Sequence, residues 1–160
     1  MAFKEGDKVP DVKLTEMVDG RPSQVSLAEL SKGKRVVVFA VPGAFTPTCS
    51  MKHLPGFVDQ NAAIRGKGVD EIVCISVNDA FVMDAWGKHS NAGGKVRMLA
   101  DGNGEFAHAV GLALDASGFG MGSRSQRYAM VVKDGKVEHL AVEPGPGLNV
   151  SSAESILAKL

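Results

Sequence analysis

One segment of the chain concentrates residues that can do redox chemistry. It reads VPGAFTPTCSMKHLPGF, residues 41–57, and places Cys49 three residues after Thr46. The chain has one other cysteine, Cys74. The reactive form of a cysteine is the thiolate, and the unpaired N–H groups at the start of a helix favour it over the thiol. Polar neighbours argue against an apolar pocket, so Cys49 is predicted to be a reactive thiol.

The residues around Cys49 fit a site built on a stiff loop. The Thr46 hydroxyl can donate and accept a hydrogen bond, within reach of the sulfur or of an incoming oxygen. Pro42 and Pro47 restrict the loop. Pro55 cannot continue a regular helix, which predicts a kink that lets the turn around Cys49 melt separately.

Cys74 receives the opposite interpretation. It lies inside EIVCISV, an apolar run, and a buried thiol in such a strand is usually inert. The functional alternative is a resolving thiol that forms a disulfide with Cys49. That bond needs Cα atoms within about 7 Å. Because Cys49 follows one strand and Cys74 lies in the middle of another, a bridge would require backbone movement.

His53 and the cysteines suggest two rival sites. His53 lies four residues after Cys49, so a Cys–His thiol hydrolase is an alternative enzyme class. Nothing marks the third orienting group or the oxyanion site that such an enzyme needs. A zinc site made of Cys49, His53 and Cys74 misses the usual ligand spacings, so no metal is predicted.

Length and charge exclude several classes of function. The 160 residues fit a single domain, residues 1–160, with one hydrophobic core. Eighteen basic residues balance eighteen acidic ones, which leaves no overall field for nucleic acid or anionic membranes. No apolar run approaches the ~18 residues of a membrane span. The first residues lack the apolar core of a secretory signal, and the expected location is the cytoplasm.

The first half of the chain predicts a parallel strand–helix–strand unit. Residues 12–25 alternate like a hairpin and lead into a short helix over 26–30. Residues 34–42 and 68–79 are apolar runs typical of strands buried on both faces. A helix over 48–64 connects them. Such a unit has parallel strands and a right-handed crossover, and it places Cys49 at the carboxyl end of a strand.

The second half is predicted to form, in order, a helix over 80–89, a strand over 96–101, a short helix over 104–111, a flexible Gly-rich loop over 118–125, a hairpin over 126–143 and a last helix. Asp134-Gly135 is a type I′ turn signal within the hairpin. Ser151 and Glu154 form a capping box for the last helix. The sum is an α/β fold with a central mixed β-sheet flanked by helices, in a thioredoxin-like layout.

Several segments together resemble one family. VPGAFTPTCSMKHLPGF resembles the active-site segment of type II (peroxiredoxin-5 class) peroxiredoxins, in its P-x-x-x-T-x-x-C form. CISVNDAFVMDAW, RYAMVVKDGKV and the last helix are similar to the same family in the same order. The resemblance covers nearly the whole chain. It implies a thioredoxin-fold thiol peroxidase that reduces hydrogen peroxide and alkyl hydroperoxides in antioxidant defence.

The resemblance also implies roles for individual residues. The family's peroxidatic cysteine matches Cys49, its threonine matches Thr46 and its proline matches Pro42. Its active-site arginine precedes an aromatic residue after a Gly-rich loop, which matches Arg127. Cys49 would attack a peroxide oxygen, and Arg127 would favour the thiolate and donate to both oxygens as the O–O bond breaks.

The substrate site implied by the same resemblance includes backbone and loop groups. Thr46 would align the peroxide with the sulfur, and the Gly43 backbone would assist. Arg124 is a second candidate for the substrate-binding arginine, and its alternative is a solvated charge at the end of a loop. Pro42 would shield the oxidised sulfur from a second oxidation. No metal, flavin or heme cofactor is expected.

The chain departs from the animal-type branch of the family. Those members carry a resolving cysteine before the last helix, whereas the matching stretch here, PGLNVSSAES, has none. The Cys49 sulfenic acid would then be reduced by an outside thiol or by Cys74. The plant and bacterial pattern favours glutaredoxin with glutathione over thioredoxin, and it implies a homodimer. A redox sensor that signals through Cys49 oxidation is the non-enzymatic alternative.

Overall fold

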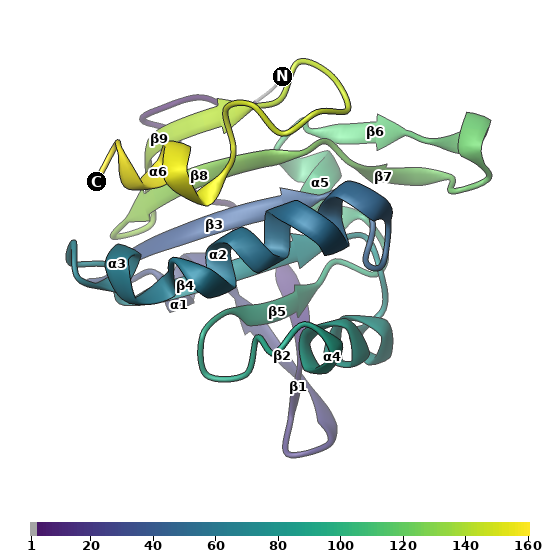
Figure 1. The fold of residues 1–160 in the computed structure, drawn as a ribbon, viewed down its shortest axis with the longest axis horizontal. Coiled ribbons are helices and arrows are strands. Elements are labelled where there is room, and N and C mark those ends of the chain that lie inside the picture. The colour runs from purple at the N-terminus through teal and green to yellow at the C-terminus, as the bar shows by residue number, and fades with distance from the viewer. Residues whose placement is uncertain (1–2) are drawn as a thin grey trace.

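Seven strands form one mixed sheet, in the spatial order β2-β1-β5-β4-β3-β8-β9, in a computed structural model that describes residues 3–160 (Figure 1). The strands of this sheet are β1 (Lys13–Val18), β2 (Arg21–Ser26), β3 (Arg35–Val41), β4 (Glu71–Ser76), β5 (Arg97–Ala100), β8 (Tyr128–Lys133) and β9 (Lys136–Val142). A separate two-stranded ladder consists of β6 (Ala113–Asp115) and β7 (Ser123–Ser125).

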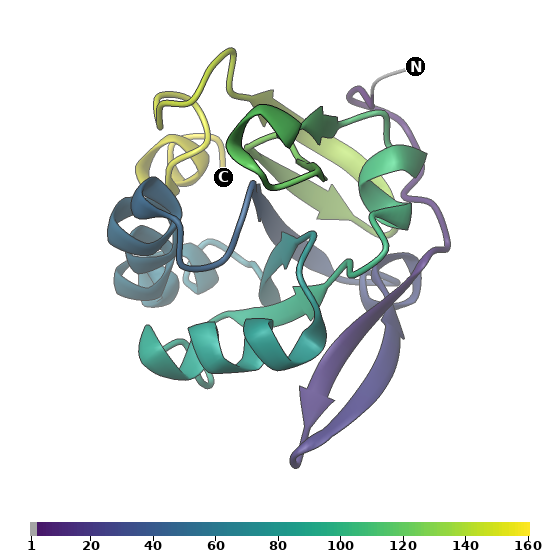
Figure 2. The same cartoon turned by 90° about the vertical axis from the view of Figure 1, so that its right-hand side faces the viewer.

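Helices cover both faces of the large sheet. The helical elements are α1 (Leu27–Leu30), the π-turn η1 (Cys49–His53), α2 (Leu54–Asp59), α3 (Asn61–Arg65), α4 (Ala80–His89), α5 (Glu105–Ala109), the 3₁₀ turn η2 (Ser117–Phe119) and α6 (Ala153–Leu157). Figure 1 shows α2, α3, α4 and α6 on the near face. In both views the β1–β2 hairpin projects from the body of the molecule (Figure 2).

The central strand β3 contributes side chains to two hydrophobic cores, one on each face of the sheet. It is parallel to β4 and antiparallel to β8, and its side chains alternate between the faces. Val37, Phe39 and Val41 pack with Cys49 and the helices of the near face, whereas the alternate residues of β3 pack toward α1 and α5. A strand buried on both faces needs a continuous apolar sequence. The apolar run over 34–42 is thereby explained.

The predicted fold class and its main units are confirmed. The β3 and β4 strands pair in parallel as the strand–helix–strand unit requires, and the β1–β2 and β8–β9 hairpins form. Both residues of the β8–β9 turn have positive φ, 48° at Asp134 and 78° at Gly135. This is the backbone that a type I′ turn needs. Ser26 caps α1, since its side chain accepts from the Glu29 amide.

Three local predictions are wrong. The helix over 48–64 is divided into η1, α2 and α3. The flexible loop over 118–125 instead contains η2 and β7, which pairs with β6. The last helix is capped by Ser152, whose side chain accepts from the Ser155 amide. Ser151 does not cap it because its amide and hydroxyl bind Glu143.

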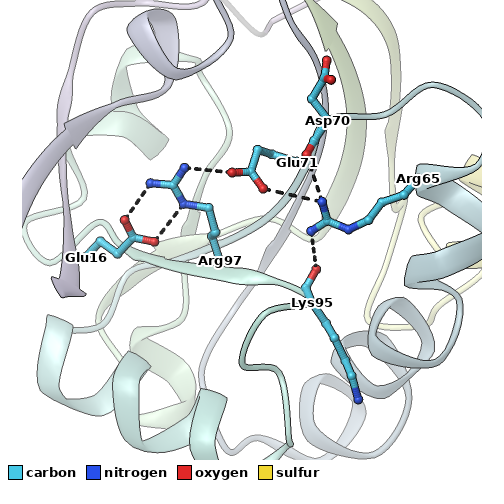
Figure 3. A network of polar contacts seen from close by, with 6 residues as sticks. All are labelled: Glu16, Arg65, Asp70, Glu71, Lys95 and Arg97. Atoms are coloured by element: carbon cyan, nitrogen blue, oxygen red, sulfur yellow. Dashed lines mark hydrogen bonds and ion pairs between the residues drawn. The ribbon is translucent and has the colours of Figure 1, made fainter. Parts of the chain in front are cut away.

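A network of charges crosses the sheet away from Cys49. Arg97 on β5 donates to Glu16 on β1 and to Glu71 on β4 (Figure 3). Arg65 on α3 lies 3.7 Å from Glu71 and donates to the carbonyls of Asp70 and Lys95. The network ties the strands of this part of the sheet to α3. Among residues 3–160, no helix is long and apolar enough to cross a membrane.

Candidate active site

Cys49 lies just beyond the carboxyl end of β3, in a helical segment of unusual geometry. Helical backbone begins at Pro47, and η1 starts at Cys49 itself. The Leu54 amide donates to the Cys49 carbonyl, five residues back instead of four. Pro55 has no N–H to continue an α-helical ladder, which explains why a wider turn precedes it. Single π-turns of this kind are frequent at functional sites.

The Cys49 thiol is fully buried beside an arginine. Arg127 Nη2 donates to Cys49 Sγ at 3.1 Å, and Arg127 itself is only 6% exposed. Cys49 otherwise packs in an apolar cluster that includes Leu54 and Trp86. The expectation that polar sequence neighbours exclude an apolar pocket is therefore wrong. The guanidinium therefore places a positive charge directly against the sulfur.

His53 is bound at both of its ring nitrogens. Nε2 lies 2.8 Å from the Ser151 carbonyl oxygen, and Nδ1 lies 2.9 Å from Arg127 Nη1. Burial and then the Arg127 charge lower the pKa of His53 to about 3, against the opposing effects of the Ser151 hydrogen bond and Glu143. His53 is thus neutral at pH 7. Because neither nitrogen is left for Cys49, the geometry does not provide the Cys–His pair of a thiol hydrolase.

Glu143 organises the loop that supplies the Ser151 carbonyl. Its carboxylate accepts from the amides of Asn149, Val150 and Ser151 and from the Ser151 hydroxyl, at 2.7–3.1 Å. Burial raises the pKa of Glu143, but these hydrogen bonds outweigh it and hold the pKa below its ordinary value. The loop before α6 is therefore fixed on an ionised carboxylate.

The other predicted site residues form a second group, on the loop between β3 and η1 and on β7. The Thr46 hydroxyl donates to the Gly43 carbonyl at 2.7 Å, and Arg124 Nη1 donates to the Pro42 carbonyl at 3.5 Å. A Cβ on Gly43 would lie 3.0 Å from Thr46 Cγ2 and 3.1 Å from Arg124 Nη1. A side chain at this position would require these neighbours to shift by a few tenths of an ångström. Within residues 3–160 no hydrogen bond joins Thr46 directly to Cys49.

Side chains that the sequence did not single out hold the two groups in place. The Ser50 amide donates to the Thr46 carbonyl, and Trp86 Nε1 donates to the Ser50 hydroxyl at 2.9 Å. Asn78 Oδ1 accepts from the Ala44 amide. The roles of His53 and Glu143 were also missed. A lone acid between a strand and a Gly/Pro-rich loop, as in VEPGPG, is a signal that could have identified Glu143.

Cys74 lies in the middle of β4, opposite Phe39 of β3, and is fully buried in the same apolar cluster as Cys49. Burial, and secondarily the nearby Cys49 sulfur, raises the pKa of Cys74 well above its usual range. Both cysteines are free thiols. In the described part of the chain, no group of three or more His, Cys, Asp or Glu residues is arranged to hold a metal ion.

Comparisons with known proteins by sequence and by structure give one consistent family. The Redoxin family profile matches residues 4–157. Peroxiredoxin-2B of Arabidopsis thaliana is 49% identical over 156 residues, which cover 97% of this chain and 96% of that protein. The crystal structure of reduced Prx3 from Vibrio vulnificus in complex with H₂O₂ is 48% identical, has a TM-score of 0.94 and is covered over 98% of both chains. Peroxiredoxin 5 from Alvinella pompejana is 36% identical, with a TM-score of 0.85 over 98% of this chain and 96% of that one.

A thioredoxin-like α/β fold with a buried thiol beside an arginine defines a redox protein of the Redoxin class. The chain belongs to this family and, within it, to the peroxiredoxins. Its activity is that of a thiol peroxidase.

Proposed function

We propose that Cys49 is the peroxidatic nucleophile and that Arg127 stabilises it as the thiolate. The observation that carries the proposal is the 3.1 Å contact between Arg127 Nη2 and Cys49 Sγ. Thiolate and arginine are both buried, so the charge acts at low dielectric. The sulfur attacks one oxygen of ROOH, the O–O bond breaks, and RO⁻ leaves and takes up a proton. The products are the Cys49 sulfenic acid and ROH.

Arg127 retains a donor for the reacting peroxide. Among the described residues its Nε–H is buried and has no hydrogen-bond partner. Nε shares one edge of the planar guanidinium with Nη2, which binds the sulfur. A donor on that edge suits an oxygen in contact with Cys49, where negative charge develops as the O–O bond breaks.

Thr46, Pro42 and Gly43 would orient the substrate. The Thr46 hydroxyl already donates to Gly43, so its remaining lone pairs accept the O–H of a hydroperoxide. Pro42 would limit access of a second peroxide to the oxidised sulfur. Arg124 holds Pro42 and the Met121 carbonyl, which favours a role in shaping the loop over direct contact with substrate. The H₂O₂ complex of the Vibrio relative supports hydrogen peroxide as a substrate.

The reductant is proposed to be an outside thiol. The loop before α6 has no cysteine, and the buried, protonated Cys74 is a poor resolving group. The resemblance to plant and bacterial members favours glutathione with glutaredoxin over thioredoxin, and the proposed location is the cytoplasm. The chain is further proposed to form a homodimer through exposed apolar side chains near the site, Phe45, Met51 and Phe119. Sedimentation of the purified protein would test the dimer.

The two cysteines give a matched test of these roles. Cys49→Ser is expected to abolish NADPH-coupled peroxide turnover, because serine supplies no thiolate. Cys74→Ser is expected to leave turnover with glutaredoxin and glutathione largely intact. Activity that survives in Cys49→Ser would refute the assignment of the nucleophile. Loss of turnover in a folded Cys74→Ser protein would identify a resolving thiol, and a wild type that is oxidised once without cycling would favour a sensor.

A further inference from the structure

A ring of contacts connects the Arg127 backbone to its own side chain. The Glu143 amide donates to the Arg127 carbonyl at 2.9 Å. The Glu143 carboxylate fixes Ser151, whose carbonyl binds His53, and His53 in turn binds the Arg127 guanidinium. The ring begins and ends at the arginine that contacts Cys49. None of its other members touches the sulfur by hydrogen bond within residues 3–160.

The chemistry of the ring determines which histidine nitrogen carries the proton. The Ser151 carbonyl can only accept, so Nε2 must be the protonated nitrogen. Nδ1 then has a lone pair and accepts from Arg127 Nη1. A protonated His53 would place a second cation against the guanidinium, and the low pKa of His53 agrees with the neutral form. Each hydrogen bond of the ring therefore pairs one donor with one acceptor.

A neutral acceptor has a consequence for the charge of Arg127. A carboxylate at the position of His53 would fix the guanidinium equally well, but it would offset the positive charge that the Cys49 thiolate needs. Without an acceptor at this position, the planar guanidinium of Arg127 would not be held in one orientation. Imidazole supplies an acceptor without a charge, and burial keeps it in that form.

We propose that His53 is a positioning residue that holds the Arg127 guanidinium against Cys49, and that the Glu143 loop fixes His53 through the Ser151 carbonyl. The inference rests on the proposed roles of Cys49 and Arg127. It assigns the loop before α6 a task in the reaction that does not depend on a cysteine. Misplacement of such a group by about 1 Å can lower a rate constant by about 100-fold.

Two substitutions separate the contacts of His53. His53→Gln places an amide N–H near the position of Nε2 and can still reach Ser151, but it offers no acceptor at the position of Nδ1. His53→Asn places an amide oxygen near the position of Nδ1 and can still accept from Arg127. The readouts are the rate constant with hydrogen peroxide, the rate constant with iodoacetamide, and the pH midpoint of thiolate formation followed by ultraviolet absorbance.

His53→Gln is expected to lower the peroxide rate constant about 10- to 100-fold and to raise the thiolate midpoint. Iodoacetamide alkylation at saturating pH should change less, because it needs the thiolate but not the arginine donors. His53→Asn keeps an acceptor for Arg127 but loses the bond to Ser151, so its peroxide rate constant and its thiolate midpoint should lie between those of the wild type and those of His53→Gln. A purely structural role would instead lower stability in both variants without moving the midpoint.

A folded His53→Gln protein with wild-type peroxide rate and midpoint would overturn the proposal. If His53→Gln does not fold, His53→Asn decides, because a lowered peroxide rate constant with a raised midpoint supports the proposal and wild-type values of both contradict it. Arg127→Lys is measured in parallel. If Arg127→Lys keeps full activity, the proposed role of Arg127 is wrong. If Arg127→Lys is inactive while His53→Gln is unaffected, only the proposed role of His53 is wrong.

Discussion

Two arginines in this molecule have opposite surroundings. Arg97 donates through Nε and Nη2 to Glu16 and through Nη1 to Glu71, at 2.7–3.2 Å (Figure 3). Arg127 is more deeply buried, yet its hydrogen-bond partners are a neutral imidazole and a thiol. In the described residues one of its donors has no partner at all.

The difference separates an arginine that stabilises the fold from one kept available for chemistry. Hydrogen bonding to Glu16, opposed by partial burial and aided by the charges of Glu16 and Glu71, raises the pKa of Arg97. Those two carboxylates neutralise the positive charge of Arg97. The charge of Arg127 is not compensated by an acid, which is unfavourable for folding and favourable for a thiolate. A residue that lowers the stability of the fold in this way is expected to serve a function.

The largest effect that this comparison predicts is on activity at Arg127. Arg127→Met should lower the peroxide rate constant by about 10²–10³-fold, because the developing charge loses its donor. The melting temperature should change little, because the desolvation cost of the buried guanidinium is removed together with its hydrogen bonds to His53 and Cys49. Stopped-flow peroxide kinetics and thermal unfolding measure the two quantities. If Arg127→Met were destabilised but fully active, Arg127 would stabilise the fold and would have no role in the reaction.

A second prediction concerns the pH dependence of stability. His53 has a pKa of about 3 in the folded chain, whereas an unfolded histidine titrates near about 6.5. Between these values the unfolded chain binds a proton that the folded chain does not, so stability is complete above pH 6.5 and falls as the pH is lowered. By pH 5 the loss from His53 alone is about 2 kcal/mol. Glu143 adds a further loss below about pH 4.3, its ordinary unfolded value.

Denaturant unfolding from pH 7 to pH 4.5 would measure this slope. His53→Gln should flatten it, because the group that gains the proton is gone. Arg97→Met should keep the wild-type slope, since the charge network contains no histidine. Equal slopes in the wild type and in His53→Gln would show that the histidine is not held neutral.

The sequence predicted what depends on local pattern and missed what depends on distant contacts. The apolar run over 34–42 and the Asp134-Gly135 turn identify a buried strand and a hairpin, because alternation and turn chemistry are local. The contact of Cys49 with Arg127 joins residues 78 positions apart and was anticipated only through the family resemblance. The contact between His53 and Ser151 spans 98 positions and could not be read from spacing. Polar neighbours in sequence also misled, since the cysteine points into the core.

Of the effects expected at the two arginines, the smallest is the loss of stability at Arg97. Arg97→Met removes the shared partner of Glu16 and Glu71 and leaves two carboxylates close together on β1 and β4. Because the Arg97 side chain is 30% exposed, water screens the loss, and the expected destabilisation is about 1 kcal/mol. The peroxide rate constant should not change.

Lys88→Met, which removes an exposed pair with Asp84, is a matched control with an effect on stability nearer zero. A large loss of activity in Arg97→Met would mean that its charge reaches the cysteine after all, and the distinction between the two arginines would fail.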